Sequence, residues 1–129
     1  MNAKDIMTRD VITVGPTMTV RSLATLLIKN QISGAPVAGR NGKIVGVVSE
    51  SDIVAKKGKD VKAIMTKNLI SVAEETPVEE IARLMTTHKI KRLPVMHGNT
   101  VVGIVSRADI VSAIAMGKHV ALHTPVYDL

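Results

Sequence analysis

The strongest constraint on the fold is an internal repeat, because most of the chain's motifs occur twice in the same order. "DIMTRDVITV" (5–14) aligns with "AIMTKNLISV" (63–72), and "ISGAPV" (32–37) aligns with "IKRLPV" (90–95). The stretch "VVSESDIV" returns later in the chain as "IVSRADIV". A single copy would bury too little apolar surface to be stable alone. We therefore predict two similar units that pack together with pseudo-two-fold symmetry.

Hydrophobic periodicity changes in the same order within each copy. Short β-rich runs at 11–14 and 69–72 precede apolar residues spaced at i, i+3, i+4 and i+7, which predict an amphipathic helix in each copy. The second of these helices has the clearer start, with Thr76 as N-cap, Pro77 at the first helical position and Glu79 completing a capping box. Met18 stands where the second copy has Thr76, so the first helix start is less well defined.

The second half of each copy predicts a hairpin followed by a helix. Two β-rich runs flank a turn that contains Asn41-Gly42 or Gly98-Asn99. A further helix begins near Ser49 or Ser106. The sequence thus predicts an α+β fold of two β-α-β-β-α repeats, at residues 1–58 and 59–117, followed by a C-terminal tail at 118–129.

Composition narrows the possible partners. Lys and Arg (17) outnumber Asp and Glu (11), and the net charge of +6 attracts phosphate-bearing molecules. The chain has no Trp or Phe, and Tyr127 is its only aromatic residue. Proteins that bind single-stranded nucleic acid stack bases on aromatic rings, so that mode of binding is disfavoured. A purine held here would instead lie between aliphatic side chains.

Other classes of site and location are disfavoured by what the sequence lacks. The absence of cysteine excludes disulfides and thiolate metal sites. His119 and His123 have helical spacing but no nearby third metal ligand, so no metal site is expected. No constellation of nucleophile, base and orienting group indicates an enzyme. Without a signal-peptide pattern or a membrane-spanning run, we expect a soluble cytoplasmic protein with no membrane association.

The repeated Ser-x-x-Asp pattern has two interpretations. Ser49 with Asp52, and Ser106 with Asp109, have the spacing of a helix N-cap, in which the carboxylate also complements the helix dipole. The same groups suit a nucleotide, because a carboxylate accepts hydrogen bonds from two adjacent ribose hydroxyls. Phosphate near the start of the following helix would also meet free N–H groups. Capping and binding can coexist, and the spacing alone does not separate them.

Taken together, the paired "IMT", "APV"/"LPV" and "GVVSESD"/"GIVSRAD" motifs resemble a tandem cystathionine-β-synthase (CBS) domain pair, also called a Bateman module, of the stand-alone type. The resemblance covers about residues 3–117. It implies a non-catalytic regulatory module that binds an adenosine-containing ligand (AMP, ADP, ATP or S-adenosylmethionine) in clefts between the two repeats. It also implies a homodimer and an effector protein that the sequence does not identify.

The resemblance implies two ligand sites, each with contributions from both repeats. The first site combines Val47, Ser49, Asp52, Thr66, Ile70, Ile90, Lys91 and Arg92. The second combines Thr8, Ile12, Ile32, Ser33, Ile104, Ser106 and Asp109. In both sites isoleucines supply the aliphatic walls for the base.

A charge difference separates the two predicted sites. Lys91-Arg92 precedes the proline in one repeat, where the other has Ser33-Gly34. Cations favour an anionic ligand, and Arg binds phosphate bidentately. The sequence therefore predicts that AMP, ADP or ATP prefers the Asp52 site, although the cations also suit an ordinary helix end.

Two other functions stay open at this point. One is a basic nucleic-acid-binding protein, which the positive charge favours and the lack of aromatic residues disfavours. The other is a purely structural dimerisation module, in which Ser and Asp serve only as helix caps.

Overall fold

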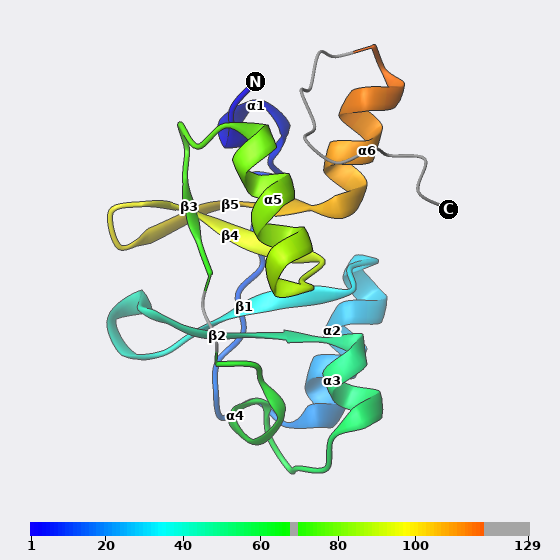
Figure 1. Ribbon diagram of the computed structural model, residues 1–129. Coiled ribbons are helices and arrows are strands. Elements are labelled where there is room, and N and C mark those ends of the chain that lie inside the picture. The colour runs from blue at the N-terminus through cyan, green and yellow to red at the C-terminus, as the bar shows by residue number, and fades with distance from the viewer. Residues whose placement is uncertain (68–69, 118–129) are drawn as a thin grey trace. The chain divides into compact units, whose positions relative to one another are not determined.

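The chain folds into two compact units, which are described in a computed structural model (Figure 1). The structure describes residues 1–67 and 70–117. The N-terminal unit is Val11–Leu69, and the C-terminal unit joins Met1–Asp10 to Ile70–Leu129. Each unit mixes helices with strands, which confirms the predicted α+β class.

Two predictions concern, wholly or in part, residues that the structure does not describe. The predicted tail at 118–129, with its two histidines and its tyrosine, lies outside the described residues. Within the described ranges, no helix combines the length and the apolar character needed to cross a bilayer.

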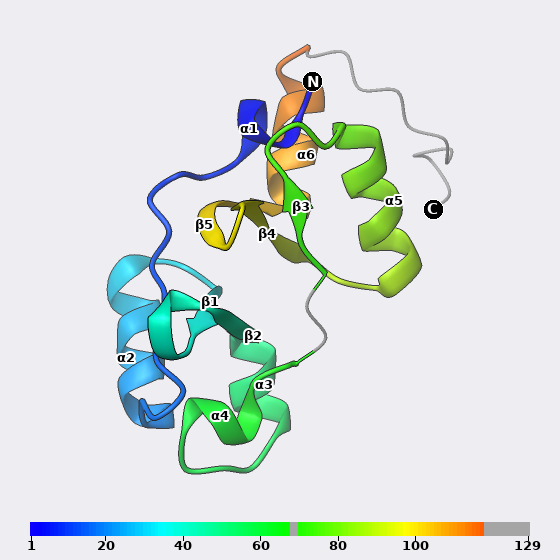
Figure 2. The ribbon, with the colours of Figure 1, turned by 90° about the vertical axis from the view of Figure 1, so that its left-hand side faces the viewer.

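The N-terminal unit is an antiparallel hairpin with helices packed against it (Figure 2). Its elements are α2 (Val20–Asn30), β1 (Gly34–Ala38), the 3-10 turn η1 (Arg40–Gly42), β2 (Ile44–Ser49), α3 (Glu50–Ala55) and α4 (Val61–Ile64). Alternate residues of β2 are buried because successive side chains of a strand point to opposite faces. Leu23 and Leu27, one turn apart on α2, pack against Val37 and Val48 of the hairpin in the core.

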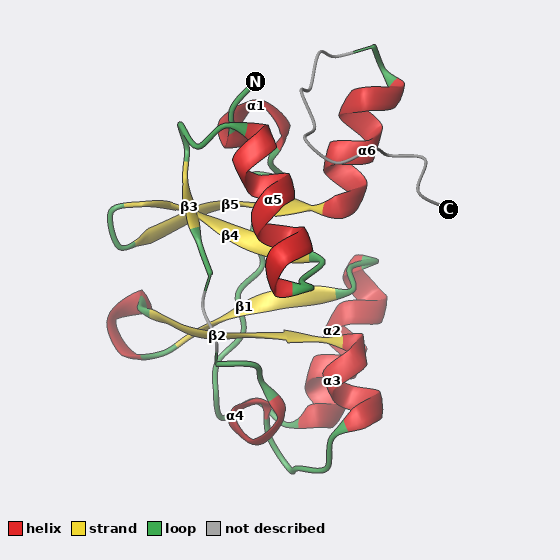
Figure 3. Cartoon of the chain, in the orientation of Figure 1, coloured by secondary structure: helices red, strands yellow, loops and turns green. Residues whose placement is uncertain are grey.

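The C-terminal unit has the same plan with one additional strand (Figure 3). Its elements are α1 (Ala3–Ile6), β3 (Val72–Ala73), α5 (Val78–His88), β4 (Arg92–His97), β5 (Thr100–Ser106) and α6 (Arg107–Ala115). β4 is central, pairing in parallel with β3 and antiparallel with β5. Ile81 and Met85 of α5 are buried with Leu93 and Val95 of β4 and Val105 of β5.

Each unit contains the leading segment of the other repeat. α1 and Met7, which begin the first repeat, belong to the core of the C-terminal unit. α4, near the start of the second repeat, buries Val61 and Ile64 in the N-terminal unit. The compact units therefore divide after residues 10 and 69, whereas the repeat places the boundary at 58/59. Apolar burial, rather than position in the repeat, decides where these short helices pack.

Two glycines make room for the methionines of the exchanged segments. A Cβ at Gly46 would lie 2.8 Å from Met65 Sδ and 2.9 Å from the Thr66 carbonyl oxygen. A Cβ at Gly103 would collide with Met7 in the same way. Both glycines therefore serve close packing within a unit.

We expect Gly46→Ala to destabilise the protein by about 1–3 kcal/mol, because the added methyl collides with a backbone carbonyl that cannot move alone. Urea denaturation would measure the change. Gly15→Ala is the matched control, since nothing lies within 4 Å of a Cβ at Gly15 and no left-handed φ is required there. Equal stabilities of the two variants would contradict the packing role.

The first strand of each repeat is shorter than predicted. In the N-terminal unit, only Val14 forms a bridge, to Val37, where a strand over 11–14 is expected. Gly15 and Pro16 follow at once, and proline has no N–H with which to continue a ladder. In the C-terminal unit, β3 comprises Val72 and Ala73, and Leu69 of the predicted strand lies outside the described residues.

The helix starts also differ in detail from the prediction. α5 begins one residue later than predicted, with Pro77 as N-cap and no side-chain cap hydrogen bond. The Thr76 hydroxyl instead accepts a hydrogen bond from the Ala73 N–H at 3.0 Å and closes the preceding turn. The first repeat has the side-chain cap, because Thr19 Oγ1 accepts from the Ser22 N–H at 3.1 Å. The predicted capping box at Thr76 is therefore wrong.

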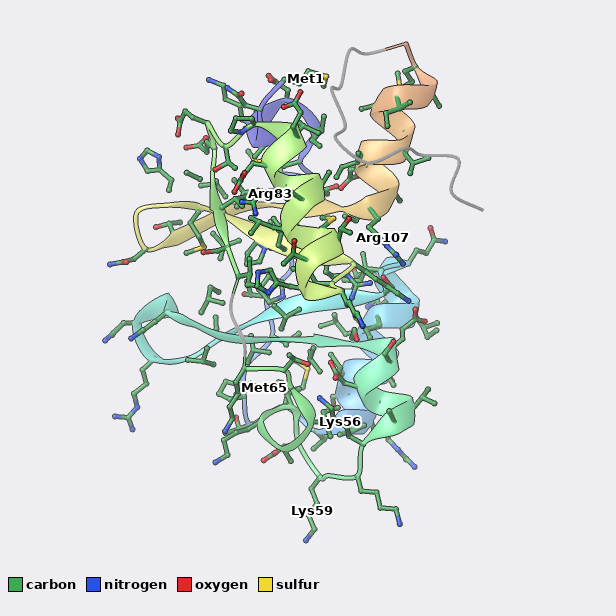
Figure 4. The ribbon with its side chains drawn as sticks, in the orientation of Figure 1. Met1, Lys56, Lys59, Met65, Arg83 and Arg107 are labelled. Carbon is green, nitrogen blue, oxygen red and sulfur yellow. The ribbon has the colours of Figure 1, made fainter. Side chains whose placement is uncertain are left out.

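An exposed ion pair on α5 shows the ordinary surface chemistry of the chain. Arg83, labelled in Figure 4, hydrogen-bonds through Nε to Glu80 Oε2 at 3.1 Å. This hydrogen bond lowers the pKa of Glu80, and the same contact raises the pKa of Arg83. Such solvated pairs contribute little to stability.

Candidate functional site

The Asp52 corner (Ser49, Asp52, Lys56 and Thr66) lies where β2 ends and α3 begins. Asp52 is the fourth residue of "SESD", so its carboxylate turns back toward the start of the helix. Asp52 Oδ2 accepts from the Ser49 N–H at 2.9 Å and from the Ser49 hydroxyl at 3.3 Å. The carboxylate thus caps the helix, as one of the two interpretations of the spacing predicts.

The second oxygen of Asp52 is also occupied. Asp52 Oδ1 lies 2.8 Å from Lys56 Nζ and accepts from Thr66 Oγ1 at 3.3 Å. Thr66 reaches this position because its backbone forms a two-hydrogen-bond bridge with Val47, at 2.8 and 3.0 Å. Asp52 is 7% exposed, and its charge is balanced from within the unit.

Lys56 is held by three partners. Besides Asp52, its ammonium group donates to the Ile64 carbonyl oxygen at 3.1 Å and to Thr66 Oγ1 at 3.4 Å. Ile64 is the last residue of α4, and a cation suits the negative end of a helix. Lys56 therefore ties α3 to α4, in the region where Figure 4 labels it.

The Asp109 corner (Thr8, Ile104, Ser106 and Asp109) repeats this arrangement in the C-terminal unit. Asp109 Oδ2 accepts from the Ser106 N–H at 2.8 Å, and Ser106 Oγ accepts from the Asp109 N–H at 3.2 Å, which completes a capping box. Thr8 bridges Ile104 at 2.9 and 3.0 Å, as Thr66 bridges Val47.

The two corners differ at the second carboxylate oxygen. Among residues 1–67 and 70–117, no side chain forms an ion pair with Asp109, and no hydrogen bond to its Oδ1 is found. Ala113 stands where the other repeat has Lys56, and it is buried in α6. α3 ends at Ala55, which places Lys56 in extended backbone, whereas α6 continues to Ala115. The Asp109 carboxylate is half-buried and retains an oxygen that can accept hydrogen bonds.

The predicted site residues divide between the two units. Val47, Ser49, Asp52 and Thr66 come together in the N-terminal unit. Thr8, Ile104, Ser106 and Asp109 come together in the C-terminal unit. The remaining residues of the first predicted site, Ile70, Ile90, Lys91 and Arg92, belong to the C-terminal unit. Those of the second, Ile12, Ile32 and Ser33, belong to the N-terminal unit. The grouping across units stays a prediction.

The predicted aliphatic walls have a packing role within their own units. Ile70 and Ile90 are partly buried against the core of the C-terminal unit, and Ile32 is partly buried against that of the N-terminal unit. Ile12 is also partly buried.

Within a unit, the residues before the proline lie beside the signature of the same repeat. The Arg107 N–H donates to the Lys91 carbonyl oxygen at 2.9 Å, and Arg92 stands opposite Ser106 in the β4–β5 ladder. In the N-terminal unit, the Glu50 N–H donates to the Ser33 carbonyl oxygen at 2.9 Å. The cationic segment therefore lies next to the Asp109 corner of its own unit.

Sequence reasoning missed three charged residues at or beside these corners. Lys56 follows Asp52 at i+4, a spacing that permits an ion pair between opposite charges at a helix end. Arg107 and Glu50 occupy equivalent positions immediately after the signature serine and carry opposite charges. Both side chains are exposed. An exposed cation therefore follows the signature serine at the Asp109 corner, and an exposed carboxylate follows it at the Asp52 corner.

The family model for the CBS domain matches the chain twice, over residues 3–58 and 61–116. Inosine-5'-monophosphate dehydrogenase from Methanocaldococcus jannaschii is 35% identical over 111 residues, which are 84% of this chain and 22% of the dehydrogenase. The chain therefore spans less than a quarter of the length of this relative.

Two solved structures are similar over most of the chain. One is the CBS domain pair of protein MJ0100 in complex with 5'-methylthioadenosine and S-adenosyl-L-methionine, with a TM-score of 0.86 and 33% identity. The other is CBSX2 in complex with AMP, with a TM-score of 0.82 and 31% identity. Each match covers 92% of this chain and 98% of the solved chain. In both solved structures the ligands contain an adenosyl group.

Proposed function

The chain belongs to the CBS domain family as a tandem pair of CBS domains, and we propose that it is a regulatory module that binds an adenosine-containing ligand. The observation that carries the proposal is the Asp109 corner, where a strand end, a helix start and a carboxylate with an available oxygen converge. Two similar CBS domain pairs hold adenosyl ligands, which supports the same ligand class here.

The chemistry of the corner suits a ribose. The 2'- and 3'-hydroxyls of a nucleoside are adjacent donors, and Asp109 can accept both through charge-assisted hydrogen bonds. Hydrogen bonds to a charged group contribute roughly 1.5–3 kcal/mol each. With no Phe, Trp or Tyr among the described residues, the base would contact aliphatic side chains, and backbone groups would hydrogen-bond to its polar edge.

We propose that the chain acts through binding and not through catalysis. The match to the dehydrogenase covers only 22% of that enzyme, so its activity does not transfer to this chain. A ligand that binds one arrangement of the domains more tightly than another shifts the population toward it, and that shift is what an effector would read. The homodimer, the effector protein and the cytoplasmic location stay predictions from the sequence.

A thermal-shift and calorimetric screen tests the proposal. We expect AMP, ADP, ATP or S-adenosylmethionine to raise the melting temperature, because a ligand that binds only the folded state stabilises it by about 2.7 kcal/mol at 100 times its Kd. Inosine 5'-monophosphate and inorganic phosphate serve as controls for the base and for simple anion binding. No response to any adenosyl ligand, combined with salt-sensitive binding of polynucleotides, would instead favour a nucleic-acid-binding function.

A further inference from the structure

We propose that the two corners differ in ligand competence: the Asp109 corner takes the adenosyl ligand, and Lys56 keeps the Asp52 corner closed. The inference rests on the proposed function and assigns it to one aspartate. It reverses the preference that the sequence predicts, because that preference treats the two Ser-Asp pairs as interchangeable.

The first step is the occupancy of the Asp52 carboxylate. A carboxylate offers about four lone-pair positions. At Asp52 these meet the Ser49 N–H, the Ser49 hydroxyl, the Thr66 hydroxyl and Lys56 Nζ. A ribose diol that approached Asp52 would have to replace at least one of these donors.

The second step is that a ribose gives Asp52 no compensation for the loss of Lys56. Its Nζ lies 2.8 Å from Asp52 Oδ1, and its other donors are directed at Ile64 and Thr66. A ligand that displaces it must break the ion pair and also withdraw a cation from the end of α4. The neutral hydroxyls of a ribose do not restore the lost charge balance at Asp52, whose side chain is only 10% exposed.

The third step is that the Asp109 corner has no equivalent obstacle. Asp109 uses Oδ2 for the Ser106 N–H, and no ion pair to its carboxylate occurs within the described ranges. Ala113 stands at the position of Lys56 and has no group that could reach the carboxylate. A ribose diol can therefore bind Asp109 without first breaking an ion pair with any of the described residues.

The fourth step is the charge around each corner. Arg107 directly follows Ser106, and the exposed Lys91 lies next to it through the Arg107–Lys91 backbone hydrogen bond. The equivalent positions in the other repeat are Glu50 and Ser33, whose backbones form the matching hydrogen bond. A phosphate-bearing adenosyl ligand is therefore attracted by Arg107 and Lys91 beside the Asp109 corner, whereas the Glu50 carboxylate beside the Asp52 corner repels it.

Calorimetric titration of the full chain with AMP tests the proposal. We expect one AMP per chain for the unchanged protein and a second binding event for Lys56→Met, which removes the ammonium group but keeps the apolar stem. Lys57→Met is the matched control, because it removes the same charge from the neighbouring exposed lysine, and it should keep one AMP per chain. Circular dichroism and the melting temperature would verify that each variant folds.

The outcomes separate this inference from the proposed function. If the unchanged protein binds AMP, and Asp52→Asn abolishes this binding while Asp109→Asn preserves it, the inference is overturned and the proposed function stays intact. Two equal sites in the unchanged protein, or no second event in Lys56→Met, would also overturn it. Absence of AMP, ADP, ATP and S-adenosylmethionine binding in all variants would overturn the function itself.

Discussion

Asp109→Asn is expected to lower AMP affinity about 100-fold, or roughly 2.7 kcal/mol of binding free energy. The substitution preserves the shape of the side chain and an oxygen that can cap the Ser106 N–H. It removes the negative charge and replaces one acceptor oxygen with an NH2 group, which cannot accept a hydrogen bond from a ribose hydroxyl. Isothermal titration calorimetry gives the affinity, and urea denaturation gives the accompanying change in stability.

Stability and affinity should separate in this variant. If Asp109 served only in the capping box, Asp109→Asn would change folding stability slightly and leave AMP affinity unchanged, because the Asn side-chain oxygen can still accept from the Ser106 N–H. An unchanged Kd for AMP would refute the assignment of the ribose to Asp109. Asp109→Ser would extend the test, because its hydroxyl lacks the reach of the carboxylate.

Asp52→Asn is expected to act mainly on stability, lowering the free energy of unfolding by about 2 kcal/mol. The carboxylate is buried and bonds Ser49, Thr66 and Lys56, so its loss weakens several contacts and leaves the ammonium group without its counter-charge. The penalty stays below that of a fully buried pair because the Lys56 side chain is 43% exposed and can turn toward water. Chemical denaturation monitored by circular dichroism measures it.

Glu80→Gln is the control for the loss of a paired carboxylate. Glu80 pairs with Arg83 on the exposed face of α5, where solvent screens the interaction, so stability should change little. AMP affinity should be nearly unchanged in both Asp52→Asn and Glu80→Gln. A destabilisation as small in Asp52→Asn as in Glu80→Gln would mean that the contacts of Lys56 contribute nothing.

The fold was largely readable because its signals are local. The spacing of Leu23 and Leu27 on α2, the turn at Gly98, and the serines that precede α3 and α6 each act within a few residues of chain. The β-strands after the two amphipathic helices were therefore expected where they are found. The strand predicted at 11–14 is not formed in full, because pairing depends on neighbours that are distant in the sequence. Only Val14 meets a partner.

The candidate site was readable only in part, for the same reason. Ser106 and Asp109 are three residues apart, so their contact follows from helix geometry. The position of Thr8 beside Ile104 depends on α1 packing into the C-terminal unit, which no local pattern indicates. The i+4 spacing of Asp52 and Lys56 permits an ion pair, but the contacts of Lys56 with Ile64 and Thr66 require α4 to lie beside α3.

The sequence by itself determined the repeat, the α+β class, the two Ser-x-x-Asp patterns and the scarcity of aromatic residues, because composition and short-range spacing are sufficient for each. Only the tertiary structure decided how the two aspartates differ. "VVSESDIV" and "IVSRADIV" place equivalent carboxylates at equivalent helix starts. The early end of α3 and the packing of α4 bring Lys56 onto Asp52. In the other repeat, α6 continues past Ala113. Residues distant in the sequence thus determine which carboxylate keeps an oxygen that can accept a ligand's hydrogen bond.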